Sequence, residues 1–170
     1  MTPDPDPVLA ALGAFRQTGE AQNEGIELDV TGELLPGWKV IANYAYTDTE
    51  ITKANDSTLG NRLPGVPKHA GNIWTTYAIQ NTALKGLTVG GGVTLRGERE
   101  GNNDNDFQLP GYALFNLMTN YTLQVGKKQV TAQFNVRNIF DKEYFPNSNS
   151  RSFIAVGEPR TFIGSVRIEY

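Results

Sequence analysis

The sequence predicts an all-β fold, namely part of an antiparallel, up-and-down transmembrane β-barrel with about seven strands. Apolar and polar residues alternate with a period of two along most of the chain, which is typical of strands with one apolar and one wet face. No helical period competes with this alternation after the first dozen residues. The expected connections also alternate between short and long, as in barrels with short periplasmic turns and longer outer loops.

Composition narrows the possible function classes. The chain has 170 residues, enough for one domain, with 19% charged residues and a net charge of -3, which argues against a nucleic-acid partner. Cysteine is absent and His69 is the only histidine, so we expect no disulfide, no metal site and no cofactor. No nucleophile–base pair or carboxylate dyad stands out, and we therefore expect no enzyme.

Any crossing of a membrane would have to rely on strands. The chain has no run of about 18 apolar residues, which a transmembrane helix would need, whereas a barrel strand needs only about 9–11 residues, half of them polar. Residues 1–15 lack a basic region and a cleavage site, so no secretory signal is expected there. Because an exported barrel needs such a signal, we expect residues 1–170 to be a C-terminal piece of a longer protein.

The alternation divides the chain into strands separated by turn-forming residues. Residues 1–12 contain Pro-rich dipeptides and are expected to form the end of a loop. Short connections carry turn residues and are expected at 35–37, 81–86 and 125–127. Long, polar connections are expected at 52–68, 97–110 and 141–159, on the outer side. The expected strands lie at about 15–34, 38–50, 69–79, 87–96, 115–121, 130–137 and 161–170.

One face of these strands is expected to contact outer-membrane lipid. Trp38 and Tyr46 share this face eight residues apart, which at ~3.3 Å per residue and a tilt near ~45° gives roughly 19 Å along the membrane normal. This spacing suits two aromatic girdles around an apolar band of about 25 Å. The aromatic residues predicted to face lipid are Trp38, Tyr44, Tyr46, Tyr77, Phe115, Tyr121, Phe134 and Phe162.

Several motifs resemble TonB-dependent siderophore receptors, and they occur in the order that this family shows. The C-terminal part carries Asn-Ile-Phe-Asp-Lys-Glu-Tyr at 138–144, Gly-Glu-Pro-Arg at 157–160 and a last strand ending on an aromatic residue. Upstream, Gly-Ile-Glu-Leu begins at Gly25, Leu-Leu-Pro-Gly-Trp at Leu34, and Leu-Pro-Gly-Val-Pro-Lys-His at Leu63. The resemblance covers nearly the whole chain.

This resemblance implies a bacterial outer-membrane barrel of about 22 strands with a plug in its lumen. It implies import of a ferric siderophore with energy passed on by TonB, and insertion by the barrel-assembly machinery. Residues 1–170 would be the C-terminal part of that barrel, without the plug, and unable to transport alone. The resemblance also assigns Val166, Ile168 and Tyr170 to a C-terminal assembly signal, although Phe is commoner than Tyr at the last position. Gln22-Asn23-Glu24 also departs from the family, which often has a basic residue and Ser there.

Two other interpretations remain open at this point. The chain could be a free-standing small outer-membrane barrel or adhesin, or a soluble ligand-binding β-barrel. The soluble barrel predicts that Trp38, Tyr44 and Phe115 lie in a core, whereas the membrane interpretations predict that they face lipid. Since lipid tolerates no unpaired sheet edge, an odd number of strands would leave an open curved sheet if the chain were alone.

A few residues are candidates for sites, each with a simpler structural alternative. Tyr144 and Phe145, next to an outer loop, are candidates for gripping a siderophore. The turn at 138–144 is expected to cap a strand, with Asp141 making a local Asx-type bond. The acidic residues between 98 and 106 are expected to be solvated rather than to bind calcium. Gly90-Gly91-Gly92 is expected to allow close packing or a bend in its strand.

Overall fold

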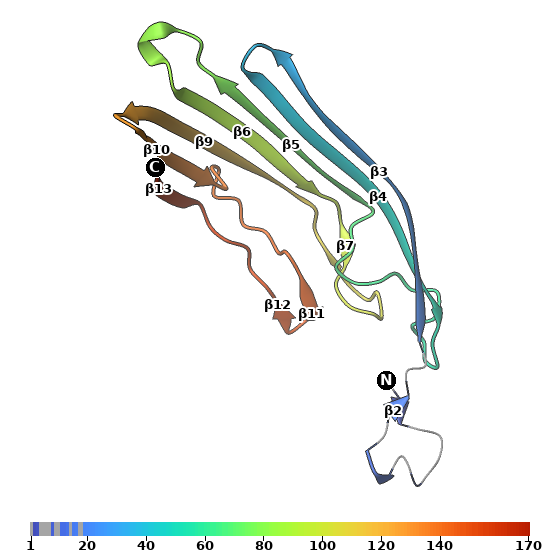
Figure 1. The fold of residues 1–170 in the computed structure, drawn as a ribbon. Coiled ribbons are helices and arrows are strands. Elements are labelled where there is room, and N and C mark those ends of the chain that lie inside the picture. Colours follow the sequence, from blue (N-terminus) through green and yellow to red (C-terminus); the bar gives the residue numbers. More distant parts are fainter. Residues whose placement is uncertain (1, 4–7, 9–10, 14, 17–18) are drawn as a thin grey trace.

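Seven long strands form one curved antiparallel sheet, in the order β13-β10-β9-β6-β5-β4-β3 (Figure 1). This computed structural model describes residues 2–3, 8, 11–13, 15–16 and 19–170. Sequence neighbours pair along the sheet, apart from short strand pairs within the loops, so the topology is up-and-down as predicted. The strands are β3 (Glu20–Leu35), β4 (Trp38–Lys53), β5 (His69–Ala78), β6 (Leu87–Arg96), β9 (Tyr112–Val125), β10 (Lys128–Arg137) and β13 (Thr161–Glu169).

The sheet is open, as the sequence predicts for this chain alone. Strands β3 and β13 are its edges and do not pair with each other. Because seven antiparallel strands alternate in direction, both edges run the same way, and an antiparallel closure needs an odd number of further strands. A free-standing closed barrel, one of the alternatives, would require these two edges to pair.

Tight turns at one end of the sheet set the register of the hairpins. Leu35 pairs with Trp38 around Gly37, whose φ is 81°, and Val125 pairs with Lys128 around Gly126, whose φ is 65°. Positive φ carries little penalty for glycine because it has no Cβ. The third connection at this end contains the short helix η1 (Thr82–Leu84). The predicted short connections are confirmed.

The register brings apolar residues from all seven strands onto one face. Trp38 pairs with Tyr77, and Tyr44 pairs with Leu28 on the other side of β4. Val93 of β6 continues the same face onto Phe115 of β9. On β10 and β13, Val130 pairs with Ile168 and Val136 with Phe162. We call this surface the apolar face and the other surface the polar face.

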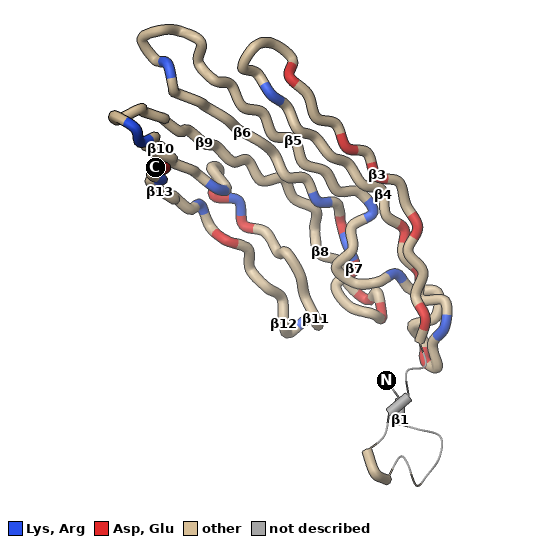
Figure 2. Tube along the Cα trace, viewed as in Figure 1, with Lys and Arg blue, Asp and Glu red and all other residues tan. Residues whose placement is uncertain are grey.

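Charge is separated between the two faces. The polar face carries Glu27 and Asp29 in the middle of β3, whereas on the apolar face the charged residues occur only near the two ends of the sheet. Apart from β3, the middle of the strands contains few charged residues (Figure 2). We call the end of the sheet with the tight turns the turn end, and the opposite end, with the long connections, the loop end. On the apolar face Glu24, Asp48 and Glu50 lie at the loop end and Lys128 at the turn end. The charged residues of the polar face are Glu27, Asp29, Glu33, Lys39, Arg96, Arg137, Arg167 and Glu169.

The apolar face is not covered by protein. Among the described residues, Leu109 is the only buried hydrophobic side chain, at 2% exposure, and it belongs to a loop rather than to the sheet. A soluble sheet of this size would bury its apolar face against a second layer. The side chains that would form a core therefore remain open to the surroundings.

The long connections lie together at the end of the sheet opposite the tight turns (Figure 1). They contain more structure than the sequence predicts: β7 (Arg99–Glu100) pairs with β8 (Gln108–Leu109), and β11 (Ser148–Ser150) with β12 (Phe153–Ile154). A further pair, β1 (Thr2–Pro3) and β2 (Phe15–Arg16), precedes the sheet. Within the part of the chain that the structure describes, no helix is long and apolar enough to cross a membrane.

At the loop end, β4 extends further than predicted and β3 begins later than predicted. The expected strand 38–50 continues to Lys53, which pairs with Glu20 of β3, and the expected strand 15–34 begins as β3 at Glu20. The Lys53 ammonium lies 2.6 Å from the Glu20 carboxylate. This exposed ion pair contributes little stability by itself.

Candidate functional site at the apolar face and the loop end

The aromatic residues predicted to face lipid all lie on the apolar face. Trp38, Tyr44 and Phe115 are 38%, 43% and 44% exposed, so none of them is packed in a protein core. The prediction that follows from a soluble barrel is therefore wrong. The same register places Tyr46, Tyr77, Tyr121, Phe134 and Phe162 on this face.

The three long connections form one continuous layer. We call residues 54–68 loop A, residues 97–111 loop B and residues 138–160 loop C. Loop B lies in the middle, and side chains join it to both neighbours. The Ser148 hydroxyl of loop C donates to the Gly101 carbonyl at 2.6 Å, and Arg151 reaches Asp106 of loop B at 3.4 Å.

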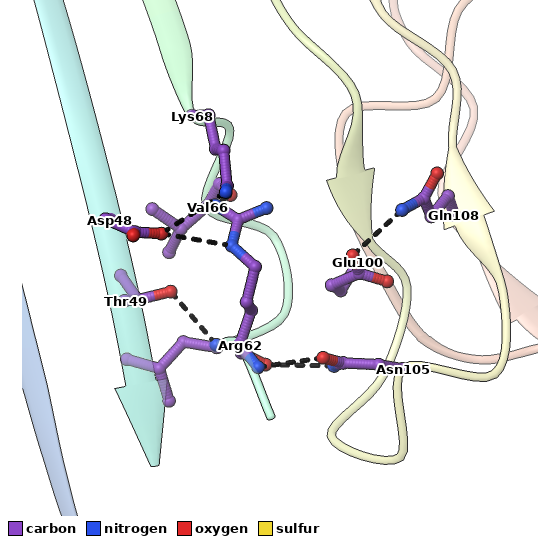
Figure 3. A network of polar contacts seen from close by, with 9 residues as sticks. Asp48, Thr49, Arg62, Val66, Lys68, Glu100, Asn105 and Gln108 are labelled. Atoms are coloured by element: carbon purple, nitrogen blue, oxygen red, sulfur yellow. Dashed lines mark hydrogen bonds and ion pairs between the residues drawn. The ribbon is translucent and has the colours of Figure 1, made fainter. Parts of the chain in front are cut away.

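Asn105 joins loop B to loop A (Figure 3). Its side-chain oxygen accepts from the Arg62 backbone N–H at 2.8 Å, and its side-chain NH₂ donates to the Arg62 carbonyl at 2.9 Å. Asn105 has a φ of 53°, a left-handed conformation that asparagine tolerates better than most residues. The hydroxyl of Thr49 on β4 accepts from the Leu63 N–H at 3.1 Å, which fixes loop A to the sheet.

Arg99 joins loop B to loop C from the inside. Its side chain is 2% exposed, and its guanidinium donates to the carbonyls of Gly97 and Pro110 in loop B and of Phe145 and Pro146 in loop C. It also lies 5.1 Å from the centre of the Tyr112 ring. Burial lowers the pKa of Arg99 because the charged form loses hydration. The carbonyl cage replaces that water, so Arg99 holds the two loops together.

Asn138 closes the base of loop C. It is 4% exposed and has a φ of 49°. Its side-chain NH₂ donates to the carbonyls of Lys142 and Glu158 at 2.9 and 3.1 Å, and its side-chain oxygen accepts from the Lys142 N–H. The start and the end of loop C are therefore joined by the side-chain amide of Asn138.

The local Asx-type bond expected for Asp141 is not what the structure contains. The Asp141 carboxylate accepts the backbone N–H of Arg160 at 2.7 Å, across nearly the whole of loop C. The bond is long-range because the turn at 138–141 brings the two ends of the loop together. The expected capping role of the turn is confirmed.

Tyr144 and Phe145, the candidates for ligand contact, take part in the loop structure. The Tyr144 ring lies 4.7 Å from the Tyr112 ring, and a Cβ at Gly157 would stand 2.2 Å from it. The carbonyl of Phe145 accepts from Arg99. Both side chains are half-buried, and a role in ligand binding stays a prediction.

A hollow of about 390 Å³ lies between loops A and B, and we call it the loop-end hollow. Arg62 and Lys68 both point at one oxygen of Asp48, at 3.6 and 3.7 Å (Figure 3). Glu100 is buried, contrary to the expectation that this acidic loop is solvated, and accepts from Gln108 at 2.9 Å. The charged and polar residues lining the hollow are Arg62, Lys68, His69, Glu98, Glu100 and Gln108.

His69 also lines this hollow and lies on the apolar face opposite Tyr46. Its Nδ1 is 2.8 Å from the Tyr44 hydroxyl, and its ring lies 5.3 Å from that of Tyr46. These contacts mark the boundary between the aromatic residues and the charged loops. Among the described residues no His, Cys, Asp and Glu group could hold a metal ion.

The polar face contains a single tryptophan that lies over the glycine run. Gly92 is opposite Trp74 in the pairing of β5 with β6, and a Cβ there would stand 2.3 Å from Trp74 Cε3 and 2.5 Å from the Ile73 carbonyl oxygen. The predicted role of Gly90-Gly91-Gly92 in close packing is confirmed. Gly91 points to the other face, beside Leu117.

Sequence reasoning did not identify Arg99, Asn105 or Arg62 as important. They stand in polar loops where every residue type is common, and no spacing distinguishes them from solvated residues. Their roles depend on contacts with residues about 40 or more positions away in the sequence, as in the pair of Arg99 with Pro146.

Comparison with known proteins places the chain among receptors. The family described as TonB dependent receptor-like, beta-barrel, matches residues 2–139. The metal-pseudopaline receptor CntO of Pseudomonas aeruginosa is 36% identical over 158 residues, which is 92% of this chain and 22% of that receptor.

Two solved structures from Acinetobacter baumannii share the sheet. The ferric preacinetobactin receptor BauA superposes with a TM-score of 0.78 at 27% identity, and the siderophore receptor PiuA with a TM-score of 0.70 at 32% identity. Each match covers 88% of this chain and 22% of the other. The chain thus spans about a fifth of the length of the relatives that it matches.

Proposed function

The chain belongs to the TonB-dependent receptor β-barrel family, and from this premise we propose that residues 1–170 form the C-terminal part of the barrel of a receptor that takes up a ferric siderophore. The barrels of this family are outer-membrane proteins of Gram-negative bacteria. The rest of the receptor would supply the remaining strands, the plug and the contact with TonB. We propose no catalytic role, since the relatives are receptors.

In this proposal the apolar face contacts lipid and the polar face lines the lumen. The observation that carries it is the separation of charge: the apolar face is charged at its ends alone, while the polar face carries Glu27 and Asp29 in the middle of β3. Lipid strongly disfavours a charge near the centre of the membrane, whereas a wet or plugged lumen accepts it. Loops A, B and C would then lie outside the cell and receive the ligand, with Tyr144 and Phe145 among the residues near it.

Strand β13 would be the closing strand of the barrel. Val166 and Ile168 lie on its apolar face, and the ring of Tyr170, just after the strand, lies 4.4 Å from the Lys128 ammonium; these three residues would form the signal read by the barrel-assembly machinery. Both edges of the sheet are free for pairing in the described part of the chain. An odd number of strands from the rest of the receptor would close the ring with antiparallel pairs only.

Adjacent residues of β9 test the assignment of faces. Leu117 lies on the apolar face and Met118 on the polar face, opposite Gly91 and Gly90 of β6. In the full-length receptor, Leu117→Lys should cost about 2–4 kcal/mol and reduce the assembled barrel, while Met118→Lys should be tolerated. Heat-modified electrophoretic mobility of outer-membrane fractions measures the assembled fraction. Equal effects of the two lysines would contradict the proposal.

Uptake tests the function itself. A strain lacking its own receptors and expressing the full-length receptor should take up radioactive iron supplied as ferric preacinetobactin or another ferric siderophore, and only when TonB is present. The metal complex of pseudopaline is the second probe, because a relative is named for it. Uptake that persists without TonB would be inconsistent with the proposed mechanism.

A further inference from the structure

A further hollow lies on the apolar face of the hairpin that β9 and β10 form. Its volume is about 260 Å³, and most of its lining is apolar. Tyr121 pairs with Ala132 and Thr119 pairs with Phe134, so the two rings stand at opposite corners and the two small side chains at the other corners. We call the space between them the hairpin hollow. A flexible hydrocarbon chain can fill a slot of this kind between two rings.

Lysine residues stand at the turn end of the same hairpin. Lys128 is on the apolar face at the start of β10, and Lys127 precedes it in the tight turn. Lys85 is in the neighbouring turn, whose Gly86 carbonyl accepts the backbone N–H of Thr122 on β9 at 2.9 Å. The end of β9 therefore lies between two turns, and Figure 2 shows positively charged residues at both of them.

The positive charge at these turns is not balanced locally. Among the described residues, none of the three lysines forms an ion pair. The Lys128 ammonium lies 4.4 Å from the centre of the Tyr170 ring, which attracts it without supplying a negative charge. The acidic side chains nearest this end, Glu33 and Glu169, are on the polar face. The turn end of the apolar face therefore has a surplus positive charge, which suits a phosphate group.

The distance between Lys128 and the hairpin hollow fits a lipid. Four residues of β10 separate Lys128 from Ala132, which is about 13 Å along the strand and roughly 9 Å along the membrane normal at a tilt of about 45°. The headgroup region of one leaflet is roughly 5–8 Å deep. A phosphate at Lys128 therefore places the hairpin hollow at the depth of the acyl chains. In the proposed orientation the turn end faces the periplasm, and phospholipids form the periplasmic leaflet of an outer membrane.

We propose that the turn end of the β9–β10 hairpin binds one anionic phospholipid of the periplasmic leaflet. The phosphate contacts Lys128, while Lys85 and Lys127 add attraction for the negative headgroup, and one acyl chain runs into the hairpin hollow. A phospholipid with an amine-bearing headgroup binds less well, because no acidic side chain of the apolar face lies at this end to receive the amine. This inference rests on the proposed function, because it requires the apolar face to contact lipid and the turn end to face the periplasm.

The test uses the full-length receptor in a neutral detergent, titrated with dimyristoyl-phosphatidylglycerol and observed by native mass spectrometry. The double variant Lys85→Gln, Lys128→Gln should weaken the retention of one lipid at least about tenfold through the lost charge. Ala132→Leu should weaken it by filling the hairpin hollow. Two matched controls should leave retention unchanged: Lys39→Gln, at the same end but on the polar face, and Ala42→Leu, on the apolar face of β4 outside the hollow. Phosphatidylethanolamine with the same acyl chains should be retained less well than phosphatidylglycerol.

The outcomes separate a lipid from a free anion. Inorganic phosphate should not displace the lipid at concentrations where the unmodified receptor retains it. Displacement by phosphate together with full retention by Ala132→Leu would indicate an anion site only and overturn the proposal. Unchanged retention in the double variant would also overturn it, as would equal retention of the two phospholipids.

Electrophoretic mobility shows whether each variant is folded. Should the double variant fail to assemble, Lys85→Gln alone and Ala132→Leu still decide the question. Iron uptake by the unmodified receptor tests the proposed function separately, so lipid retention can fail while uptake persists.

Discussion

Arg99→Gln is expected to release loop C from loop B. Two of the carbonyls that accept from Arg99, those of Phe145 and Pro146, belong to loop C, and the Pro146 contact is long at 3.3 Å. Hydrogen bonds to a charged group contribute about 1.5–3 kcal/mol each when buried, so we expect the loss of these two to lower the free energy of opening loop C by about 3 kcal/mol. That change corresponds to a factor of about a hundred in the opening equilibrium.

Hydrogen exchange in the full-length receptor measures this opening. The backbone N–H of Gly157 donates to the Tyr144 carbonyl at 2.8 Å inside loop C, so its exchange reports on the loop. Arg151→Gln is the matched control: Arg151 links the same two loops, but it is 64% exposed and should contribute no more than about 1 kcal/mol.

Arg99→Lys keeps the charge, but lysine has fewer hydrogen-bond donors than arginine. The Gly157 N–H of this variant should therefore exchange at a rate between those of the unmodified receptor and Arg99→Gln. If Arg99→Gln exchanges no faster than Arg151→Gln, the carbonyl cage does not hold the loops together and the reasoning is wrong.

Three further predictions concern the sheet and its ends, each measured on the full-length receptor. Gly92→Ala should destabilise the barrel by about 1–3 kcal/mol in denaturant unfolding, because the added Cβ meets the Trp74 ring and the Ile73 carbonyl oxygen. Gly91→Ala should cost less, because its Cβ meets mainly the flexible end of the Leu117 side chain. The reverse ranking would contradict the packing of Trp74 against Gly92. Asn138→Ala should speed proteolysis within loop C by removing three hydrogen bonds and straining a left-handed residue, and Asn138→Gly should be milder because glycine adopts that φ freely. Tyr170→Ser should reduce the amount of assembled receptor in outer-membrane fractions. It should not lower the stability of the receptor that does assemble, since Tyr170 is 92% exposed. Tyr170→Phe should behave as the unmodified chain, and an equal loss of assembled receptor in both variants would count against an aromatic assembly signal.

The sequence by itself determined which face each strand residue occupies. Side chains alternate strictly along a strand, so the face of Trp38, Tyr44 or Phe115 follows from its position, and a shift by one residue would move every apolar side chain to the wet face. The tight turns at Gly37 and Gly126 could also be predicted from the sequence, because they depend on a local backbone conformation that glycine favours. The open sheet of seven strands and the family motifs follow from the same local patterns.

Only the tertiary structure decided how the loops are joined and where the hollows lie. Asp141 bonds Arg160 rather than its own turn, and Glu100 is buried rather than solvated. Arg99 finds its carbonyl partners in a loop whose residues are more than 40 positions away. A loop has no repeating period that assigns its side chains to a face, so its contacts depend on which loops the sheet brings together. The strand register does this by placing loops A, B and C at one end.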